Sequence, residues 1–127
     1  MEVNSVFKKS TVVNEKNSAI ALKSGTLPVF ATPSMLALME QTASEHVKPY
    51  LDEGFTTVGI SANIKHISAT PIGMTVSCES TLIAVEGKKL VFSVKASDEC
   101  GLIGEGTHER FIVNIEKFMG RVNSKKA

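Results

Sequence analysis

Runs of alternating apolar and polar residues fill the second half of the chain, the pattern of β-strands with one buried face. The runs are separated by turn residues, Glu86-Gly87-Lys88 and Asp98–Gly101, which leave connections of only a few residues. Short connections join antiparallel neighbours, so the last three runs predict a meander. The four predicted strands are Thr56–Ser68, Met74–Val85, Lys88–Ser97 and Ile103–Glu116.

One helix precedes these strands, over Thr32–Val47. Thr32 is a suitable N-cap, Pro33 suits the first helical position, and Pro49 is expected to end the helix. A single helix beside an antiparallel sheet predicts an α+β fold. A further strand is possible before the helix, in a segment with the apolar residues Val3, Phe7, Val12 and Val13.

Length and charge exclude several classes of protein. The 127 residues suit a single domain over 1–127, with 119–127 expected to fray. A net charge of +1 provides no long-range field to attract nucleic acid or an anionic membrane. No stretch reaches the ~20 apolar residues that span a bilayer, and the N-terminus lacks a secretory signal, so a cytoplasmic location is expected. Cys78 and Cys100 are too few for a disulfide framework and are expected to be reduced.

Two polar residues fall on faces that should be apolar. On the helix, Glu40 lies within about 40° of Leu36, at the edge of an arc that Leu36 shares with Ala43 and Val47. Glu40 either reaches solvent or a lysine, or it is buried and needs a hydrogen-bonding partner. In the first long strand, His66 follows Val58, Ile60, Ala62 and Ile64 in one row. A structural histidine is one interpretation of His66, and a general acid–base pair with Glu40 is the other.

Other polar residues indicate no metal or nucleotide site. His46 and His108 do not form a zinc motif, and His108 lies in the row Gly104, Gly106, His108, Arg110 of the last strand. Gly104 and Gly106 indicate a close backbone approach. No P-loop, G-x-G-x-x-G or G-x-S-x-G motif is present, so no cofactor is expected. Thr32 stands where a helix N-terminus could stabilise an anion or a carbonyl oxygen.

Together, several short motifs resemble those of one known family, the fluoroacetyl-CoA thioesterase-like group of hot-dog proteins. The resemblance covers roughly residues 27 to 118. It rests on VFATP at 29–33, LME at 38–40, TVG at 57–59 with His66, ATPIG at 69–73, EGKKL at 86–90 and IGEGTHER at 103–110. It implies a long helix wrapped by a curved antiparallel sheet, and a homodimer with active sites near its interface. It also implies thioester hydrolysis of acyl-CoA, with Thr32, Glu40 and His66 at the catalytic positions.

A mechanism follows from these positions. Backbone N–H groups at the helix start or at Gly59 would stabilise the oxyanion, while Glu40 would attack the carbonyl or activate water. His66 would relay the proton, and Thr32 would orient Glu40 or the substrate. Arg110 is a candidate to bind either the CoA phosphates or carboxylates of neighbouring chains.

The acyl group is expected to be short. Apolar residues crowd the helix start, and no long loop could enclose an extended tail. No aromatic residue between Ala19 and Pro28 could roof a small pocket, so nothing favours fluoroacetyl itself. The alternatives are a hot-dog protein that binds acyl-CoA or another small ligand without turnover, and a hydratase or dehydratase.

Overall fold

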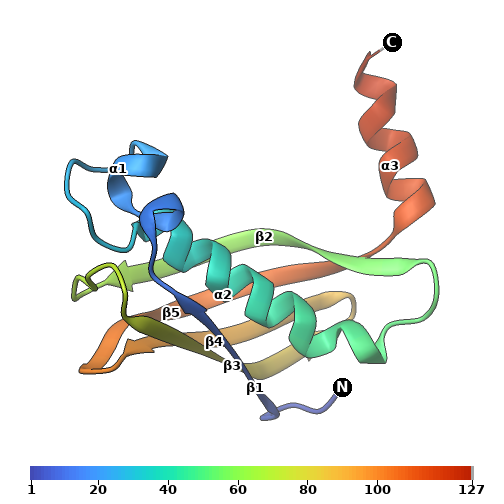
Figure 1. The fold of residues 1–127 in the computed structure, drawn as a ribbon. Coiled ribbons are helices and arrows are strands. Elements are labelled where there is room, and N and C mark those ends of the chain that lie inside the picture. The colour runs from blue at the N-terminus through green and yellow to red at the C-terminus, as the bar shows by residue number, and fades with distance from the viewer. Residues whose placement is uncertain (127) are drawn as a thin grey trace.

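A five-stranded antiparallel sheet curves around one long helix in the computed structural model, which describes residues 1–126 (Figure 1). The α+β class predicted from the sequence is therefore confirmed. The strands are β1 (Val6–Val12), β2 (Phe55–His66), β3 (Thr75–Glu86), β4 (Lys89–Asp98) and β5 (Gly101–Asn114). The helices are α1 (Ala19–Leu22), α2 (Thr32–Val47) and α3 (Ile115–Asn123), with short 3-10 turns at Glu15–Asn17, Lys48–Tyr50 and Ser124–Lys126.

The order of strands across the sheet is β1-β3-β4-β5-β2. The meander predicted for the last three strands is confirmed, and the segment before the helix does form a strand, β1. β2 precedes β3 in the chain but pairs with β5, at the opposite edge from β1. Both β1 and β2 therefore have one side without a partner strand in the single chain.

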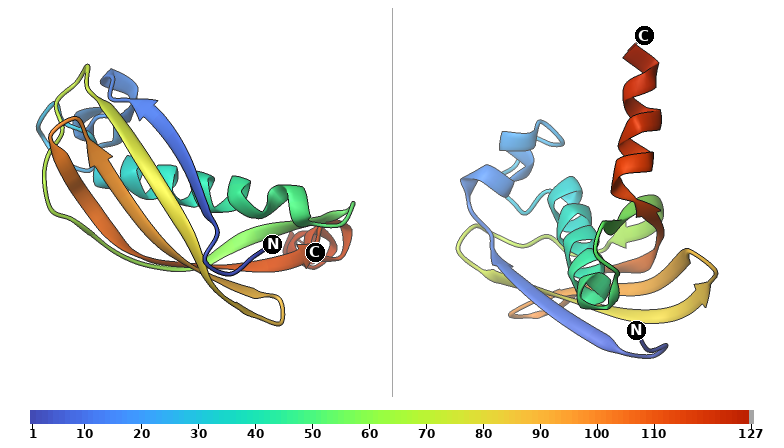
Figure 2. Two further views of the ribbon diagram at one scale, coloured as in Figure 1. Left: turned by 90° about the horizontal axis from the view of Figure 1, so that it is seen from below. Right: turned by 90° about the vertical axis from the view of Figure 1, so that its right-hand side faces the viewer.

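Helix α2 lies across one face of the sheet and supplies much of the core (Figures 1 and 2). Ala43 and Val47 are buried as the helical pattern predicts, but Leu36 is only half-buried. The buried stripe is centred instead on Met35, Met39 and the residues a turn away from them. Because the sheet curves around the helix, the side of α2 that it buries differs from the side that the apolar residues alone predicted. The buried residues of α2 are Met35, Leu38, Met39, Thr42, Ala43, His46 and Val47.

Two glycines of β5 let the helix and the edge strand approach closely. A Cβ atom at Gly104 would lie 2.5 Å from Met35 Sδ, and one at Gly106 would overlap the carbonyl oxygen of Asn63. Neither position has room for a side chain. The close approach predicted from these glycines is confirmed.

A β-bulge divides β2 into two halves. Odd-numbered residues face the helix before the bulge, and even-numbered residues face it after the bulge. The register with β5 shifts between Gly59 and Ser61, so Ile60 is an extra residue. Before the bulge, Thr57 and Gly59 lie on the helix side. After it, Ala62, Ile64 and His66 lie on that side, because they pair with the row His108, Gly106 and Gly104. The predicted single row was wrong for Val58 and Ile60, although it placed His66 correctly.

The C-terminal residues form a helix and not the frayed tail expected from residue 119. Asn114 caps α3 by accepting a hydrogen bond from Lys117 N at 3.0 Å. The helix projects from the end of β5, away from the sheet (Figure 2), and none of its residues is buried. A side-chain cap thus holds a regular helix even where few tertiary contacts form. Ala127 lies outside the described residues.

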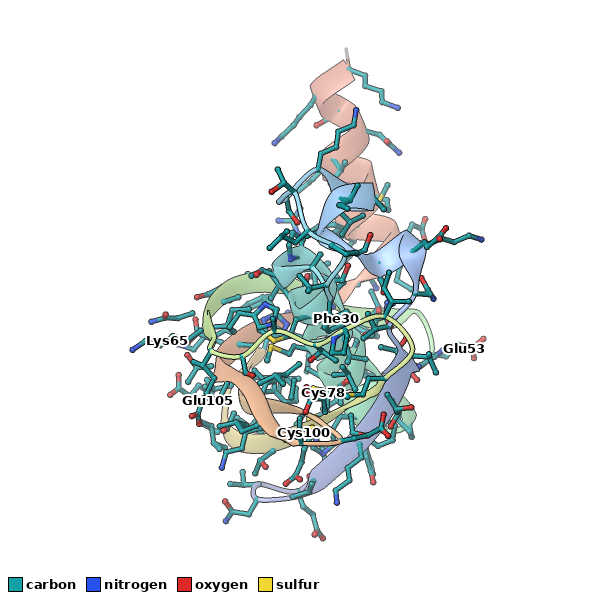
Figure 3. All side chains as sticks on the ribbon, turned by 60° about the vertical axis from the view of Figure 1, so that its left-hand side comes forward. Phe30, Glu53, Lys65, Cys78, Cys100 and Glu105 are labelled. Carbon is teal, nitrogen blue, oxygen red and sulfur yellow. The ribbon has the colours of Figure 1, made fainter. Side chains whose placement is uncertain are left out.

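Both cysteines are free in the structure. Cys78 is buried in the sheet, whereas Cys100 is exposed at the turn between β4 and β5 (Figure 3). In the same view Phe30 lies centrally, and Lys65 and Glu105 stand at one margin. None of the helices within residues 1–126 is long and apolar enough to cross a bilayer.

Candidate functional site

At the start of α2, Thr32 and His66 meet directly. Thr32 Oγ1 lies 2.8 Å from His66 Nδ1, a hydrogen bond between the helix and the end of β2. The sequence predicted Thr32 as the N-cap of α2, and this prediction was wrong. Ala31 takes that position without a side-chain bond, and Thr32 is the first helical residue. Pro33 follows within the first turn, where its missing N–H costs nothing. The Thr32 hydroxyl is therefore committed to His66 and not to the backbone.

The Thr32–His66 pair lines a cavity of about 280 Å³. The cavity lies between the segment that contains α1 and the chain that follows β2, and Phe30 is part of its wall. This volume is close to the lower end of small-molecule sites, which start at about 300 Å³. The complete lining is Ala19, Ser24, Val29, Phe30, Thr32, His66, Ile67, Ser68 and Ala69.

His66 has an unused hydrogen-bonding atom. Its Nε2 is buried and has no partner among residues 1–126. Burial lowers the pKa of His66, and the polar backbone of nearby Ser68 acts in the opposite direction. The ring is therefore biased toward its neutral form, in which one nitrogen can accept a proton. Unpaired buried polar atoms are rare in folded proteins and are compatible with a role in binding or catalysis.

Glu40 lies further along α2, facing Arg110 of β5. Its side chain is 44% exposed, and Oε2 is 4.0 Å from Arg110 Nη1. The sequence left open whether Glu40 reaches solvent or a lysine, or is buried. In the structure Glu40 is partly exposed and has a cationic partner, which is an arginine and not a lysine. Glu40 and Arg110 also line an open hollow of about 400 Å³.

Gly59 and Arg110 both belong to the surroundings of Glu40. A Cβ atom at Gly59 would lie 2.9 Å from Glu40 Oε2, so a side chain there would push the carboxylate aside. Arg110 is only 7% exposed, and its guanidinium donates to Thr57 Oγ1 at 2.8 Å and to Thr57 O at 3.0 Å. These buried contacts place the guanidinium beside Glu40, and the binding of CoA phosphates by Arg110 stays a prediction.

His108 is a member of this group that sequence reasoning did not assign a role. Its ring is buried, with Nδ1 2.8 Å from Ser61 O and Nε2 3.2 Å from Arg110 Nη1. The signal was present in the sequence, because the two-residue period of β5 puts His108 and Arg110 on one face. Thr57 carried no such signal, since its contact with Arg110 depends on the bulge in β2.

The two groups do not meet within one chain. Thr32 and Glu40 are eight residues apart on α2, and a rise of about 1.5 Å per residue separates them by about 12 Å along the axis. β2 runs in the opposite sense, so Gly59 lies at the Glu40 end and His66 at the Thr32 end. The structure thus places Thr32 beside His66. It places both Gly59 and Arg110 beside Glu40. It does not assemble the three predicted catalytic residues in a single subunit.

No part of the chain between residues 1 and 126 offers an obvious metal centre, since no three His, Cys, Asp or Glu side chains are close enough to bind one ion. The chemistry available to the two groups is that of a carboxylate, an imidazole and a hydroxyl. These groups suit proton transfer and attack on a carbonyl carbon.

Comparison with known proteins identifies the family. The model of the family "FlK: Fluoroacetyl-CoA-specific thioesterase" matches residues 13–116. The chain belongs to this thioesterase family. A fluoroacetyl-CoA thioesterase of Streptantibioticus cattleyicolor is 41% identical over 97 residues, which cover 76% of this chain and 70% of that protein.

Solved structures of the thioesterase family agree with the fold. A structure of the fluoroacetyl-CoA thioesterase FlK is 35% identical, with a TM-score of 0.94, and the match covers 98% of this chain and 97% of that one. A mutant of FlK in complex with acetyl-CoA is 34% identical, with a TM-score of 0.94 and full coverage of both chains. The hot-dog fold and the thioester hydrolase class predicted from the sequence are therefore confirmed.

Proposed function

We propose that this protein hydrolyses short-chain acyl-CoA to the free acid and CoA, using Thr32, Glu40 and His66. The observation that carries the proposal is the Thr32–His66 hydrogen bond at 2.8 Å beside a cavity of about 280 Å³. Both residues stand at positions predicted to be catalytic from the resemblance. A relative of the same fold binds acetyl-CoA in its crystal structure, which supports an acyl-CoA as substrate.

Each of the three residues has a role in the proposal. In one route Glu40 takes a proton from a water molecule that attacks the thioester carbonyl, and His66 gives a proton to the departing thiolate. In the other route Glu40 attacks the carbonyl itself, the thiolate leaves with a proton from His66, and water then hydrolyses the acyl–Glu40 anhydride and restores both groups. Thr32 orients the His66 ring, and backbone N–H groups at the helix start or at Gly59 stabilise the oxyanion.

A homodimer would bring these residues together. The outer side of β2 has no partner strand, and Ile60 on it is 50% exposed. Unpaired edges of this kind favour pairing with a second copy about a two-fold axis. Antiparallel pairing of two β2 strands sets the Gly59 end of one beside the His66 end of the other. Glu40 of one protomer would then approach Thr32 and His66 of its partner.

The proposed acyl pocket is short. A cavity of about 280 Å³ lies just below the usual range of small-molecule sites, and this supports a small acyl group. Between Ala19 and Pro28 no aromatic residue covers it. Since a pocket distinguishes substrates by about 1–3 kcal/mol per methylene, we expect several short acyl groups to be accepted. The cytoplasmic location and the absence of a cofactor stay predictions.

Thiol release from a panel of acyl-CoAs tests this function. We expect kcat/KM to be highest among acetyl-, propionyl- and butyryl-CoA and to fall for octanoyl- and palmitoyl-CoA. Binding of acyl-CoA with no thiol release would indicate a binding protein. A change in enoyl absorbance without free CoA would indicate a hydratase or dehydratase. A rise toward palmitoyl-CoA would contradict the short pocket.

Mixing two inactive variants tests the shared site. Glu40→Gln and His66→Ala homodimers are combined and allowed to exchange subunits. If the site spans two protomers, each mixed dimer keeps one intact site, and random exchange restores about a quarter of wild-type activity. If each chain contains its own site, the mixture stays inactive. Sedimentation of the wild-type protein as a stable monomer at micromolar concentration would contradict the dimer itself.

A further inference from the structure

His108 connects two structural features that meet at Glu40. Its Nδ1 lies 2.8 Å from Ser61 O on β2, and its Nε2 lies 3.2 Å from Arg110 Nη1 on β5. The residue is 1% exposed, and its ring stacks on Phe92 at 6.4 Å between centroids. Since solvent does not reach the ring, both ring nitrogens depend on these two protein partners.

Only one protonation state of His108 satisfies both partners. A carbonyl oxygen only accepts hydrogen bonds, so Nδ1 carries the proton toward Ser61. A guanidinium only donates, so Nε2 presents its lone pair to Arg110. Burial, followed by the charge of Arg110, lowers the pKa of His108, while Ser61, Glu40 and Glu109 act in the opposite direction. The ring therefore remains neutral in the tautomer that the geometry requires.

The contact with His108 fixes the end of Arg110 that faces Glu40. Thr57 already binds Nε and Nη2 of the guanidinium, which leaves Nη1. Nη1 is the atom that donates to His108 and also the atom 4.0 Å from Glu40 Oε2. A guanidinium is planar, so contacts on three of its nitrogens set its orientation.

The contact with Ser61 acts on the bulge in β2. Ser61 follows the extra residue of the bulge, and Gly59 precedes it. Gly59 in turn lies against Glu40, where a Cβ atom would come within 2.9 Å of Oε2. His108 thus holds the strand at the point where its backbone faces the carboxylate.

We propose that His108 is a positioning residue, which fixes Arg110 and the β2 bulge so that Glu40 is held in its reactive place. The inference rests on the proposed function, because it assigns Glu40 to the hydrolysis. His108 touches neither Glu40 nor the substrate in this role. It acts through Arg110 on one side and through Ser61 on the other.

His46 provides a matched control from the same aromatic stack. Its ring is also buried and packs against Phe92 at 5.9 Å between centroids. It is hydrogen-bonded to Ser5 and Ser80 and has no contact with Arg110 or Glu40. Replacing His46 therefore disturbs the core to a similar extent without altering the Glu40 site.

The kinetic test uses three variants. His108→Phe keeps the stacking and removes both polar contacts, and we expect kcat to fall about 10- to 100-fold, the usual cost of a displaced catalytic group. KM should change less than about threefold, because His108 does not touch substrate. His108→Gln offers Arg110 an acceptor again and should recover most of kcat. His46→Phe should lower Tm but leave kcat within about twofold of wild type.

A second readout is independent of hydrolysis. In the ¹⁵N NMR spectrum of the arginine side chains, the two Nη groups of Arg110 should give separate signals when rotation is restrained. We expect them to merge in His108→Phe and to stay separate in His46→Phe. Separate signals or an unchanged kcat in folded His108→Phe would overturn the inference, as would an equal loss of kcat in His46→Phe. An inactive wild-type enzyme with the expected NMR result would contradict only the proposed function.

Discussion

One hydrogen bond joins Thr32 to His66 at the start of α2, whereas two turns further along Glu40 faces a guanidinium held by three other contacts. The first group is partly open to a cavity and has an unpaired ring nitrogen. The second has the exposed carboxylate of Glu40 beside a buried network of Arg110, Thr57 and His108. Substitutions of Thr32 or His66 should therefore affect only their immediate contacts. Substitutions around Glu40 should also displace the neighbouring side chains.

Glu40→Gln is expected to give the largest effect. Amide and carboxylate have the same shape, and Glu40 is half-exposed, so Tm should stay close to that of wild type. Loss of a nucleophile or general base should lower kcat by about 100-fold or more in a thiol-release assay. Glu45→Gln is the control, because Glu45 is an exposed carboxylate of the same helix that pairs with Lys9. Normal turnover in Glu40→Gln would exclude Glu40 from the chemistry.

Replacing the first pair separates chemistry from stability. His66→Ala should lower kcat by about 100-fold, and Thr32→Ala by about tenfold, since Thr32 only orients the ring. Thr32 does not cap α2, so Thr32→Ala should lose only the hydrogen bond to His66, and the free energy of unfolding measured in urea should fall by about 0.5–1.5 kcal/mol. A loss well beyond that range would contradict this assignment.

Gly59→Ala tests how closely the second group is packed. The new methyl would meet Glu40 Oε2 at 2.9 Å and His108 Cε1 at 3.3 Å. Because Glu40 can shift toward solvent, we expect a loss of kcat of about tenfold and a smaller change in Tm. In Gly120→Ala nothing lies within 4 Å of the new methyl, so this helix variant should keep its kcat and match or exceed wild-type stability. Equal kcat values in the two variants would mean that Gly59 tolerates a side chain.

The smallest expected effect is on stability as a function of pH. Burial lowers the pKa of His46, His66 and His108 in the folded protein. Unfolded histidines, with a pKa near about 6.5, therefore bind protons more readily than the folded ones. The free energy of unfolding should be fully present above about pH 6.5 and should decline as the pH falls below it. Urea unfolding of the wild type and of His46→Gln at several pH values would measure this decline. The decline should be smaller in the variant, because one of the three histidines is absent.

Much of the fold could be predicted from local patterns. Alternation and short turns located the meander, and helix-forming residues between Pro33 and Pro49 located α2. The bulge at Ile60 could not be predicted, because one extra residue leaves the composition and length of a strand unchanged. It reversed the rows assigned to Val58 and Ile60.

The candidate site was predicted in part. His66 was expected to face the helix, and it does so because it lies beyond the bulge. The N-cap assigned to Thr32 was wrong because Ala31 adopts the extended backbone of a cap without a side-chain bond. Arg110 was a candidate to bind CoA phosphates or carboxylates of neighbouring chains, and its buried contacts with Thr57 and His108 were not predicted. The contact with Thr57 joins residues 53 positions apart, so no local pattern encodes it. His108 is only two positions from Arg110, and the strand period places both on one face.

The two cysteines affect how turnover has to be counted. Burial raises the pKa of the Cys78 thiol, so this cysteine should react slowly with thiol reagents. Cys100 is exposed and free, and a reagent that titrates released CoA will also label it. Each chain then contributes a background of one equivalent before any substrate is consumed. A Cys100→Ser variant removes this background, and it makes even a slow hydrolase distinguishable from a protein that only binds acyl-CoA.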